Sequence, residues 1–376
     1  MDLGNECRIL CDKEIDDYCR SENFGKILYI MGIGFDHRMN IGLSKFAEMN
    51  LNLEVWAIEH SRGGWSKDTK QIELEKKNVL IFENLIDSHN WKLAKWQVQM
   101  WKNEANSSFF IAEVESLKYI KERQSEIEKF DKVILDISAL PRSIYFNFIR
   151  GLYTEHADKL GISILVSENS AIDMSTHPIE NAEKAHDVAG FSYNREPVSS
   201  PAIVWIPVLG ESEEDTLNKE WDYLKSDQPE DIDVFPVVPF PSRNVRRADI
   251  ILGSYRKQLF STWGVEKRNI VYASEDNPYQ IARKLISVVR NYSKVMYPLK
   301  INNIECSFVF SAISSKLMRL GTLLAVLDLK EQEVPTRLID VANRGYCHPD
   351  KCQTSDVDRS DRLFLIPLKK GNHVAL

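Results

Sequence analysis

Polar side chains that suit a phosphorylated ligand recur where apolar segments of this sequence end. Arginine and histidine cations pair with phosphate, whereas carboxylates and hydroxyls bind ribose or a metal ion. If the apolar segments are parallel strands, their carboxyl ends share one sheet edge, where α/β proteins bind ligands. The candidate residues in the first half are Gly34, Asp36, His37, Arg38, Glu59, His60, Arg62, Asp136, Ser138, Arg142 and Glu168.

Arg142 carries the most specific expectation of this set. The segment Lys132–Ile137 has the apolar, partly β-branched pattern of a buried strand. Pro141 suits the first turn of a helix, where its missing N–H costs nothing. Arg142 should therefore be exposed in that first turn and bind an anion beside the helix-start N–H groups. The alternative is that Arg142 pairs with Asp136 and braces the loop.

A second junction between a strand and a helix lies at Ser314, Ser315 and Lys316. Serine hydroxyls, helix-start N–H groups and a lysine can cradle an anion. The alternative is an ordinary helix with a serine cap. The segment is not a phosphate-binding loop of the Walker type, because it has no glycines.

The motifs of common enzymes are missing. Gly32 and Gly34 begin a dinucleotide-binding pattern, but His37 stands where the third glycine belongs. There is no Gly-x-Ser-x-Gly elbow and no metal-binding histidine spacing. The sequence therefore identifies no catalytic residue, no metal ligand and no cofactor, and it leaves open whether Cys347, His348 and Cys352 bind a metal.

The elements that position the candidate residues alternate between strands and helices. Such alternation predicts an α/β protein with two Rossmann-like domains and mainly parallel sheets. We expect an N-terminal arm at residues 1–25, a first domain at 26–195 and a second at 202–376. Strands of the first domain are predicted at Lys26–Ile33, Leu53–Ile58, Asn78–Phe82, Lys132–Ile137 and Ile162–Val166, with helix across 90–130. The last strands, Val334–Val341 and Arg362–Pro367, are assigned to the second domain.

Composition places the chain among soluble globular proteins. It has 376 residues, of which 43% are hydrophobic and 27% charged. No apolar run is long enough to span a bilayer and the N-terminus lacks a signal peptide, so we expect a cytoplasmic protein without membrane contact. Residues 1–200 carry 24 Lys and Arg against 32 Asp and Glu, and residues 201–376 carry 24 against 23. This balance argues against a dedicated nucleic-acid binder, although Arg243, Arg246 and Arg247 could form a local basic patch.

Asp136-Ile137-Ser138, followed by Arg142, resembles the strand-to-helix segment of CARF-type Rossmann-like sensors from prokaryotic defence systems. The resemblance covers about residues 26–170 and implies a domain that binds nucleotide second messengers. The leading hypothesis is thus a nucleotide-binding or phosphorylated-ligand-binding sensor in antiviral defence, with a protein partner or a second copy of the chain as its target. The alternatives are a metal-dependent enzyme acting on nucleotides and a structural subunit of a complex.

Overall fold

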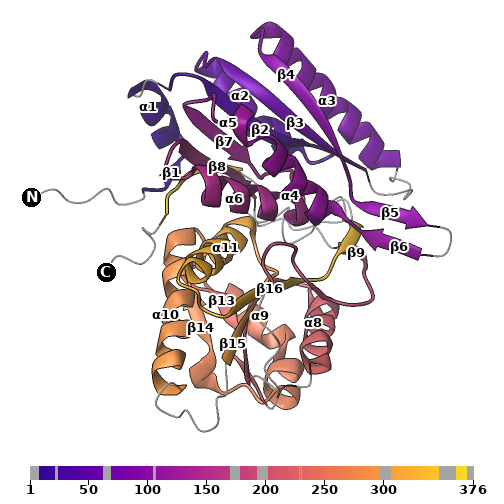
Figure 1. The fold of residues 1–376 in the computed structure, drawn as a ribbon, viewed down its shortest axis with the longest axis vertical. Helices are drawn as coiled ribbons and strands as arrows, with labels where there is room; N and C mark the ends of the chain where they lie inside the picture. The colour runs from indigo at the N-terminus through magenta and orange to yellow at the C-terminus, as the bar shows by residue number, and fades with distance from the viewer. Residues whose placement is uncertain are drawn as a thin grey trace, which may run out of the picture. The chain divides into compact units, whose positions relative to one another are not determined.

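The chain folds into two compact α/β units, which confirms the predicted fold class. The first unit comprises Met1–Pro178 and Arg344–Asn372, and the second comprises Ile179–Asn343 and His373–Leu376. Each unit contains one mainly parallel sheet of seven strands (Figure 1). The computed structural model describes residues 8–21, 24–61, 69–104, 107–169, 178–192, 202–227, 229, 231–296, 306–346 and 361–370.

The sheet of the first unit has the strand order β1-β18-β8-β7-β2-β3-β4. The five strands from β8 to β4 in this order are parallel. Strand β18 pairs antiparallel with both β8 and β1. The strands are β1 (Leu10–Cys11), β2 (Ile27–Ile33), β3 (Leu53–Ser61), β4 (Lys92–Gln99), β7 (Lys132–Asp136), β8 (Gly161–Glu168) and β18 (Arg362–Leu368). Strand β2 is buried at every position, so its sequence is a continuous apolar run.

Helices cover both faces of this sheet. One face packs against α1 (Lys13–Ser21), α2 (Ile41–Glu48) and α3 (Thr69–Ser88), through residues such as Ile15, Phe46 and Phe82. The other face carries α4 (Ala112–Glu122) and α6 (Arg142–His156), which lie side by side (Figure 1). A Cβ at Gly151 of α6 would lie 2.3 Å from Ile120 Cγ2, so glycine permits this close helix contact. A short helix α5 (Gln124–Ile127) follows α4, and the 3-10 helix η1 (His37–Asn40) precedes α2.

Two terminal segments differ from their predicted assignments. The predicted N-terminal arm contains α1, whose Ile15 and Cys19 are buried in the core of the first unit. The predicted second-domain strand at Arg362–Pro367 pairs with β8 of the first sheet. Strand β1 of the N-terminal segment pairs with β18, which in turn pairs with β8. These pairings join residues far apart in the sequence, so a local pattern does not reveal them.

The segment between β3 and β7 was predicted incorrectly. Asn78–Phe82 lies inside the 20-residue helix α3 rather than in a strand. Asn78 and Phe82 are buried there, whereas Leu80 and Ile81 are exposed, so the apolar run is not a buried strand. The predicted helix across 90–130 begins instead with β4, an edge strand. A hairpin of β5 (Trp101–Glu104) and β6 (Ser107–Phe110) follows before α4 (Figure 1).

The sheet of the second unit has the order β10-β16-β15-β11-β13-β14, with β12 also paired to β11. The strands are β10 (His186–Asp187), β11 (Ala202–Val208), β12 (Ile232–Val234), β13 (Val237–Pro239), β14 (Val271–Ala273), β15 (Cys306–Ala312) and β16 (Thr336–Asp340). All pairs except β10 with β16 are parallel. A two-stranded ladder of β9 (Pro178–Asn181) and β17 (Asn343–Tyr346) occurs where the sequence passes between the units.

The helices of the second unit also form two layers. Helices α8 (Glu214–Ser226) and α9 (Arg247–Ser254) pack on one face, where the rings of Trp205, Trp221 and Trp263 meet. A π-helical turn η2 (Lys257–Thr262) and a 3-10 turn η3 (Lys267–Asn269) follow α9. Helices α10 (Pro278–Met296) and α11 (Lys316–Glu331) pack together.

The two units repeat one topology. Five parallel strands of each sheet follow the same order, β8-β7-β2-β3-β4 in the first unit and β16-β15-β11-β13-β14 in the second. The earliest of the five in the chain (β2 or β11) is central, the next two extend the sheet to one side, and the last two extend it to the other. In each unit a glycine lies on the central strand or just after it. This glycine lets the loop that follows the adjacent strand, β7 or β15, approach the central strand closely. A Cβ at Gly32 would lie 3.1 Å from Ala139 O, and one at Gly210 would lie 2.3 Å from Ile313 O. The repeat is thus visible in backbone geometry, although the two halves share no clear residue pattern.

Candidate functional site

The strand order of the first unit reverses between β2 and β7. The chain runs from β2 to β3 and β4 on one side, and then returns to β7 and β8 on the other. In doubly wound sheets, the loops at such a reversal separate and leave a crevice at the carboxyl ends of the strands. The residues after β2 and after β7 border this position, as the sequence predicts.

Asp136 supports the loop after β7. It is 1% exposed, and its Oδ2 accepts a hydrogen bond from the Tyr29 hydroxyl at 2.6 Å. Its Oδ1 accepts another from the Ser138 backbone N–H at 2.8 Å. Burial, together with the Asp136 carboxylate, raises the Tyr29 pKa well above its ordinary value, so the phenol stays a donor. A Cβ at Gly42 would lie 2.6 Å from the Tyr29 hydroxyl, so α2 covers this pair.

Ser138 and Arg142 are both buried at the start of α6. The Ser138 hydroxyl accepts a hydrogen bond from the Ser167 N–H at 2.8 Å, which ties the loop to the end of β8. Arg142 is the first residue of α6 and is only 5% exposed, so the expectation of an exposed arginine was wrong. The helix packs all along its length, which draws its first side chain inward. Pro141, the N-cap residue, supplies no side-chain hydrogen bond to the helix start.

Asp36 and Arg38 pair with each other in the loop after β2. The Asp36 carboxylate caps η1 by accepting from the Arg38 N–H at 3.0 Å, and it also binds the Arg38 guanidinium, with Nη2 to Oδ2 at 2.7 Å. The Arg38 side chain is 3% exposed. This ion pair shapes the turn, and Arg38 therefore offers a ligand less charge than the sequence indicates.

His37 lies between these two residues and is half exposed. Its Nε2 lies 3.0 Å from Oδ2 of Asp361, and Oδ1 of Asp361 accepts from Asn169 Nδ2 at 2.9 Å. The hydrogen bond with Asp361 raises the pKa of His37 above its ordinary value, although burial opposes the shift. Burial raises the pKa of Asp361, but the hydrogen bonds from His37 and Asn169 outweigh it and leave that pKa lowered. This pair joins the end of β2, the end of β8 and the start of β18.

Asp361 was absent from the predicted site. Asn169 follows Glu168 at the end of β8 and belongs to the predicted strand-end pattern. Asp361 precedes an antiparallel strand that was assigned to the other domain, and no local signal connects it with His37.

The end of β3 contributes Glu59 and His60. Gln97 Nε2 donates to Glu59 Oε2 at 3.3 Å, and a Cβ at Gly34 would lie 3.8 Å from His60 Cε1. Asn78 Nδ2 donates to the Gly34 carbonyl at 3.2 Å, so α3 also fixes this turn. Glu168 lies opposite Arg362 in the pairing of β8 with β18. Arg62 lies outside the described residues.

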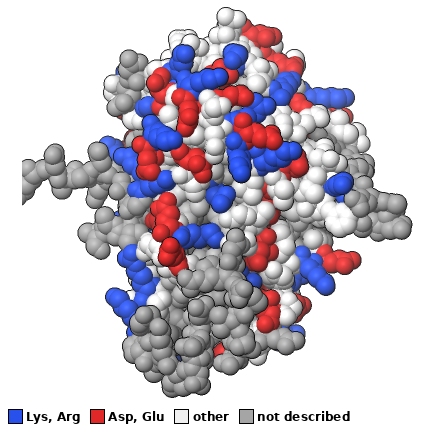
Figure 2. All heavy atoms as spheres, viewed as in Figure 1, with Lys and Arg blue, Asp and Glu red and all other residues white. Residues whose placement is uncertain are grey.

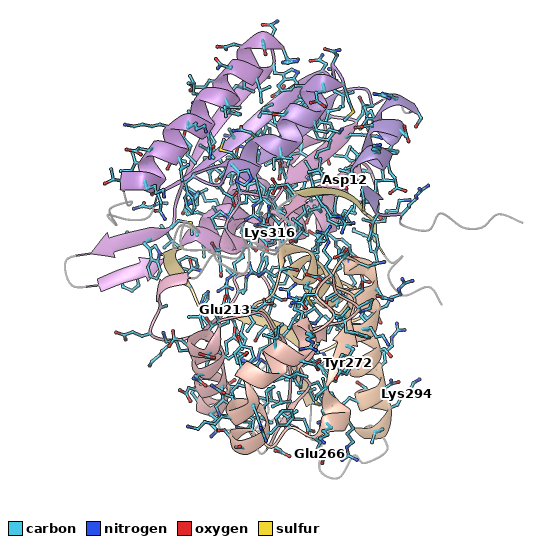
Figure 3. All side chains as sticks on the ribbon, turned by 180° about the vertical axis from the view of Figure 1, so that it is seen from behind. Asp12, Glu213, Glu266, Tyr272, Lys294 and Lys316 are labelled. Carbon is cyan, nitrogen blue, oxygen red and sulfur yellow. The ribbon has the colours of Figure 1, made fainter. Side chains whose placement is uncertain are left out.

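The corresponding position of the second unit is built differently. Its strand order reverses between β11 and β15, and α11 starts there with Lys316, labelled in Figure 3. The Ser315 hydroxyl caps α11 by accepting from the Met318 N–H at 3.4 Å. The Ser314 hydroxyl contacts Met318 Sδ at 3.2 Å. These contacts favour the serine-capped helix over the anion cradle.

The structure therefore separates the predicted site residues into two groups. The residues Gly34, Asp36, His37, Arg38, Glu59, His60, Asp136, Ser138, Arg142 and Glu168 belong to the carboxyl edge of the first sheet, whereas Ser314, Ser315 and Lys316 belong to the second unit. Within the described residues there is no group of three or more His, Cys, Asp or Glu side chains that could hold a metal ion. Cys347, His348 and Cys352 are not among them.

Comparisons with known proteins give distant likenesses only. No family model and no curated protein matches the chain. Solved structures with distant similarity include a universal stress protein from Archaeoglobus fulgidus DSM 4304, at 9% identity, 83% and 95% coverage of this chain and that one, and a TM-score of 0.22. A Pseudomonas aeruginosa UCBPP-PA14 protein classed with the universal stress proteins has 8% identity, coverage of 84% and 92%, and a TM-score of 0.23. The zinc-inhibited teicoplanin deacetylase Orf2 has 9% identity, coverage of 44% and 78%, and a TM-score of 0.23. Scores this low carry no inference about this chain.

None of the helices in the described ranges has the length and apolar character needed to cross a membrane. Basic and acidic side chains are interspersed on the face of the molecule drawn in Figure 2. That face therefore shows no extended surface of a single charge sign.

Proposed function

We propose that the first unit binds a nucleotide or a related phosphorylated ligand at the carboxyl edge of its sheet, between β2 and β7. The observation that carries this proposal is the start of α6. The helix begins at the reversal of strand order, with Arg142 as its first residue and a proline in place of a hydrogen-bonding cap. Helix-start N–H groups and an arginine together favour a bound anion.

His37 supplies the second feature that a phosphorylated ligand would use. Its side chain is 53% exposed, and Asp361 raises its pKa, which favours the imidazolium form. An imidazolium that keeps one N–H on Asp361 can donate its other N–H to a phosphate oxygen. Asp36 lies near that second nitrogen, with His37 Nδ1 and Asp36 Oδ1 at 3.9 Å, so ligand binding would have to compete with this contact.

The finer hypothesis is a sensor that responds to a nucleotide second messenger and signals to a protein partner or to a second copy of the chain. It rests on the resemblance of Asp136-Ile137-Ser138 and Arg142 to CARF-type defence sensors, with no matching family model behind it. The competing hypotheses are an enzyme that turns over the nucleotide and a structural subunit without a ligand.

Thermal melts test the proposal directly. The purified chain is melted with adenine and guanine nucleotides and with cyclic mono-, di- and oligonucleotides. A ligand present at 100 times its Kd should stabilise the first unit by about 2.7 kcal/mol, which raises its Tm by a few degrees. A compound that raises the Tm is then incubated with the protein and Mg²⁺. Turnover would favour the enzyme, and the absence of any shift across the set would favour the structural subunit.

A further inference from the structure

Charge in the second unit is divided between two consecutive parts of the chain. Residues 202–239 contain two Lys and Arg against ten Asp and Glu, whereas residues 240–296 contain eleven against four. The basic part begins at the end of β13 and runs through α9 and β14 to the end of α10. Every basic residue in it except Arg247 is exposed. The near-neutral balance of the second half of the sequence conceals this division.

The same basic part carries exposed apolar side chains. Six of the eleven large apolar residues that are exposed in the described chain lie in it. Phe240 is 51% exposed and Tyr272 is 46% exposed, and their rings meet edge to face with centroids 6.0 Å apart. Figure 3 labels Tyr272, which belongs to β14, one of the two edge strands of this sheet. The remaining four are Val245, Ile250, Phe260 and Val295.

The loop after β13 holds aromatic and basic residues in a fixed arrangement. Phe240 N–H donates to Ala273 O at 2.7 Å, and Glu275 N–H donates to Pro241 O at 3.0 Å, so this loop is attached to the loop after β14. Arg243 N–H donates to Glu275 Oε2 at 3.0 Å. Arg246 N–H donates to Asn244 Oδ1 at 3.0 Å. The exposed Phe240, Arg243 and Arg246 therefore project from a loop that is ordered by its backbone.

Arg247 explains why this loop is ordered. Its side chain is 8% exposed and pairs with Glu211, with Nε to Oε1 at 2.6 Å, and with Glu275. A buried arginine with two carboxylate partners connects the ends of β11, β13 and β14. The predicted local patch of Arg243, Arg246 and Arg247 thus divides into two exposed cations and one internal anchor.

We infer that the surface formed by Phe240, Tyr272, Arg243 and Arg246 binds single-stranded nucleic acid. Exposed aromatic rings stack on bases whatever their sequence, and arginines beside them neutralise the backbone phosphates. The surface lies at the carboxyl ends of β13 and β14, in the other unit from the proposed nucleotide site. An acidic protein segment would also meet the arginines, but it would gain nothing from base stacking.

Fluorescence anisotropy with a labelled 20-nucleotide oligouridylate at 50 mM salt tests this inference. Wild-type protein should bind, and the affinity should fall as salt rises. The doubly substituted variant Arg243→Glu, Arg246→Glu should flatten the slope of log K against log salt by about 1.4, which is two phosphate contacts on a single strand. The matched control is Lys92→Glu, Lys95→Glu on β4 of the first unit, which changes the same charge and should leave the slope unchanged.

The aromatic pair is tested separately. Phe240→Ala and Tyr272→Ala should each weaken binding by about tenfold, the loss of one base-stacking contact. Phe109→Ala is the control, because Phe109 is 49% exposed in the first unit. Absence of oligouridylate binding would overturn the inference. Binding that is insensitive to both aromatic variants, or equally tight binding of polyglutamate, would also overturn it and would indicate a general polyanion surface.

Discussion

The imidazole of His37 and the carboxylate of Asp361 lie 3.0 Å apart across 324 positions of sequence. His37 follows the central strand of the first sheet, and Asp361 precedes the antiparallel strand β18. Their contact holds Asp361, the residue directly before β18, at the proposed ligand edge. Both groups titrate, so the contact should depend on pH.

The coupling between His37 and Asp361 should be strongest in mildly acidic solution. A raised histidine pKa means that its stabilising effect is complete below the ordinary histidine pKa and is lost as pH rises through the folded value. A lowered aspartate pKa means that its effect is present above the ordinary aspartate pKa and is lost as pH falls through the folded value.

A double-mutant cycle with His37→Gln and Asp361→Asn measures this coupling. Urea unfolding at about pH 5.5, between the two ordinary pKa values, should give a larger coupling free energy than unfolding at about pH 9. His37 is half exposed, so the coupling should also shrink when salt is added. Equal coupling at both pH values would show that the pair is not ionic.

Tyr29 should contribute to stability through its hydroxyl. Tyr29→Phe removes the donor to the buried Asp136 carboxylate, and a hydrogen bond to a charged group is worth about 1.5–3 kcal/mol. The free energy of unfolding in urea should fall by that amount. Tyr119→Phe is a suitable control, because the ring of Tyr119 stacks on Trp96 with centroids 3.7 Å apart, and Phe preserves that stacking. A similar decrease in the free energy of unfolding for both variants would contradict a specific stabilising role of the Tyr29 hydroxyl.

Gly210 should resist substitution, because a Cβ there would lie 2.3 Å from the carbonyl oxygen of Ile313 and 3.0 Å from Ser314 Cα. Both atoms are backbone, so Gly210→Ala should destabilise the second unit by about 1–3 kcal/mol. Apart from its chain neighbours and the nearby backbone of its own helix, Gly253 in α9 has no atom within 4 Å of its Cβ position, so Gly253→Ala should stabilise the second unit by about 0.5–1 kcal/mol. Calorimetry that finds both variants neutral would contradict the close approach of the β11 and β15 loops.

Local pattern was sufficient to predict the central elements of the fold. Strand β7 and helix α6 follow from a buried apolar run and the helical spacing after Pro141. Strand β4 could not be predicted in this way, because it is an edge strand that is exposed at most of its positions and has no apolar run. Its neighbour α3 was misread because the apolar cluster of Asn78–Phe82 resembles a short strand.

The candidate site was only partly predictable, because side-chain contacts depend on tertiary structure. The residues at the strand ends could be identified from the sequence. The pairing of Arg38 with Asp36 and the burial of Arg142 could not be predicted. The position of Asp361 beside the site depends on the antiparallel pairing of β18 with β8. These strands are nearly 200 positions apart in sequence, and strand pairing at that separation has no local signature.

The central claim is that one nucleotide binds to each chain at the start of α6. Native mass spectrometry tests this claim most directly. Arg142 and Lys316 are the first residues of the equivalent helices α6 and α11, so Arg142→Gln and Lys316→Gln form a matched pair. Circular dichroism first confirms that both variants remain folded, because Arg142 is buried. Each protein is then mixed with the nucleotides used for the thermal melts. We predict one nucleotide per chain for wild type and Lys316→Gln, with binding weakened at least about tenfold in Arg142→Gln, the loss of a charge-assisted hydrogen bond. No adduct on the wild-type chain, or an adduct lost in Lys316→Gln and kept in Arg142→Gln, would contradict the account.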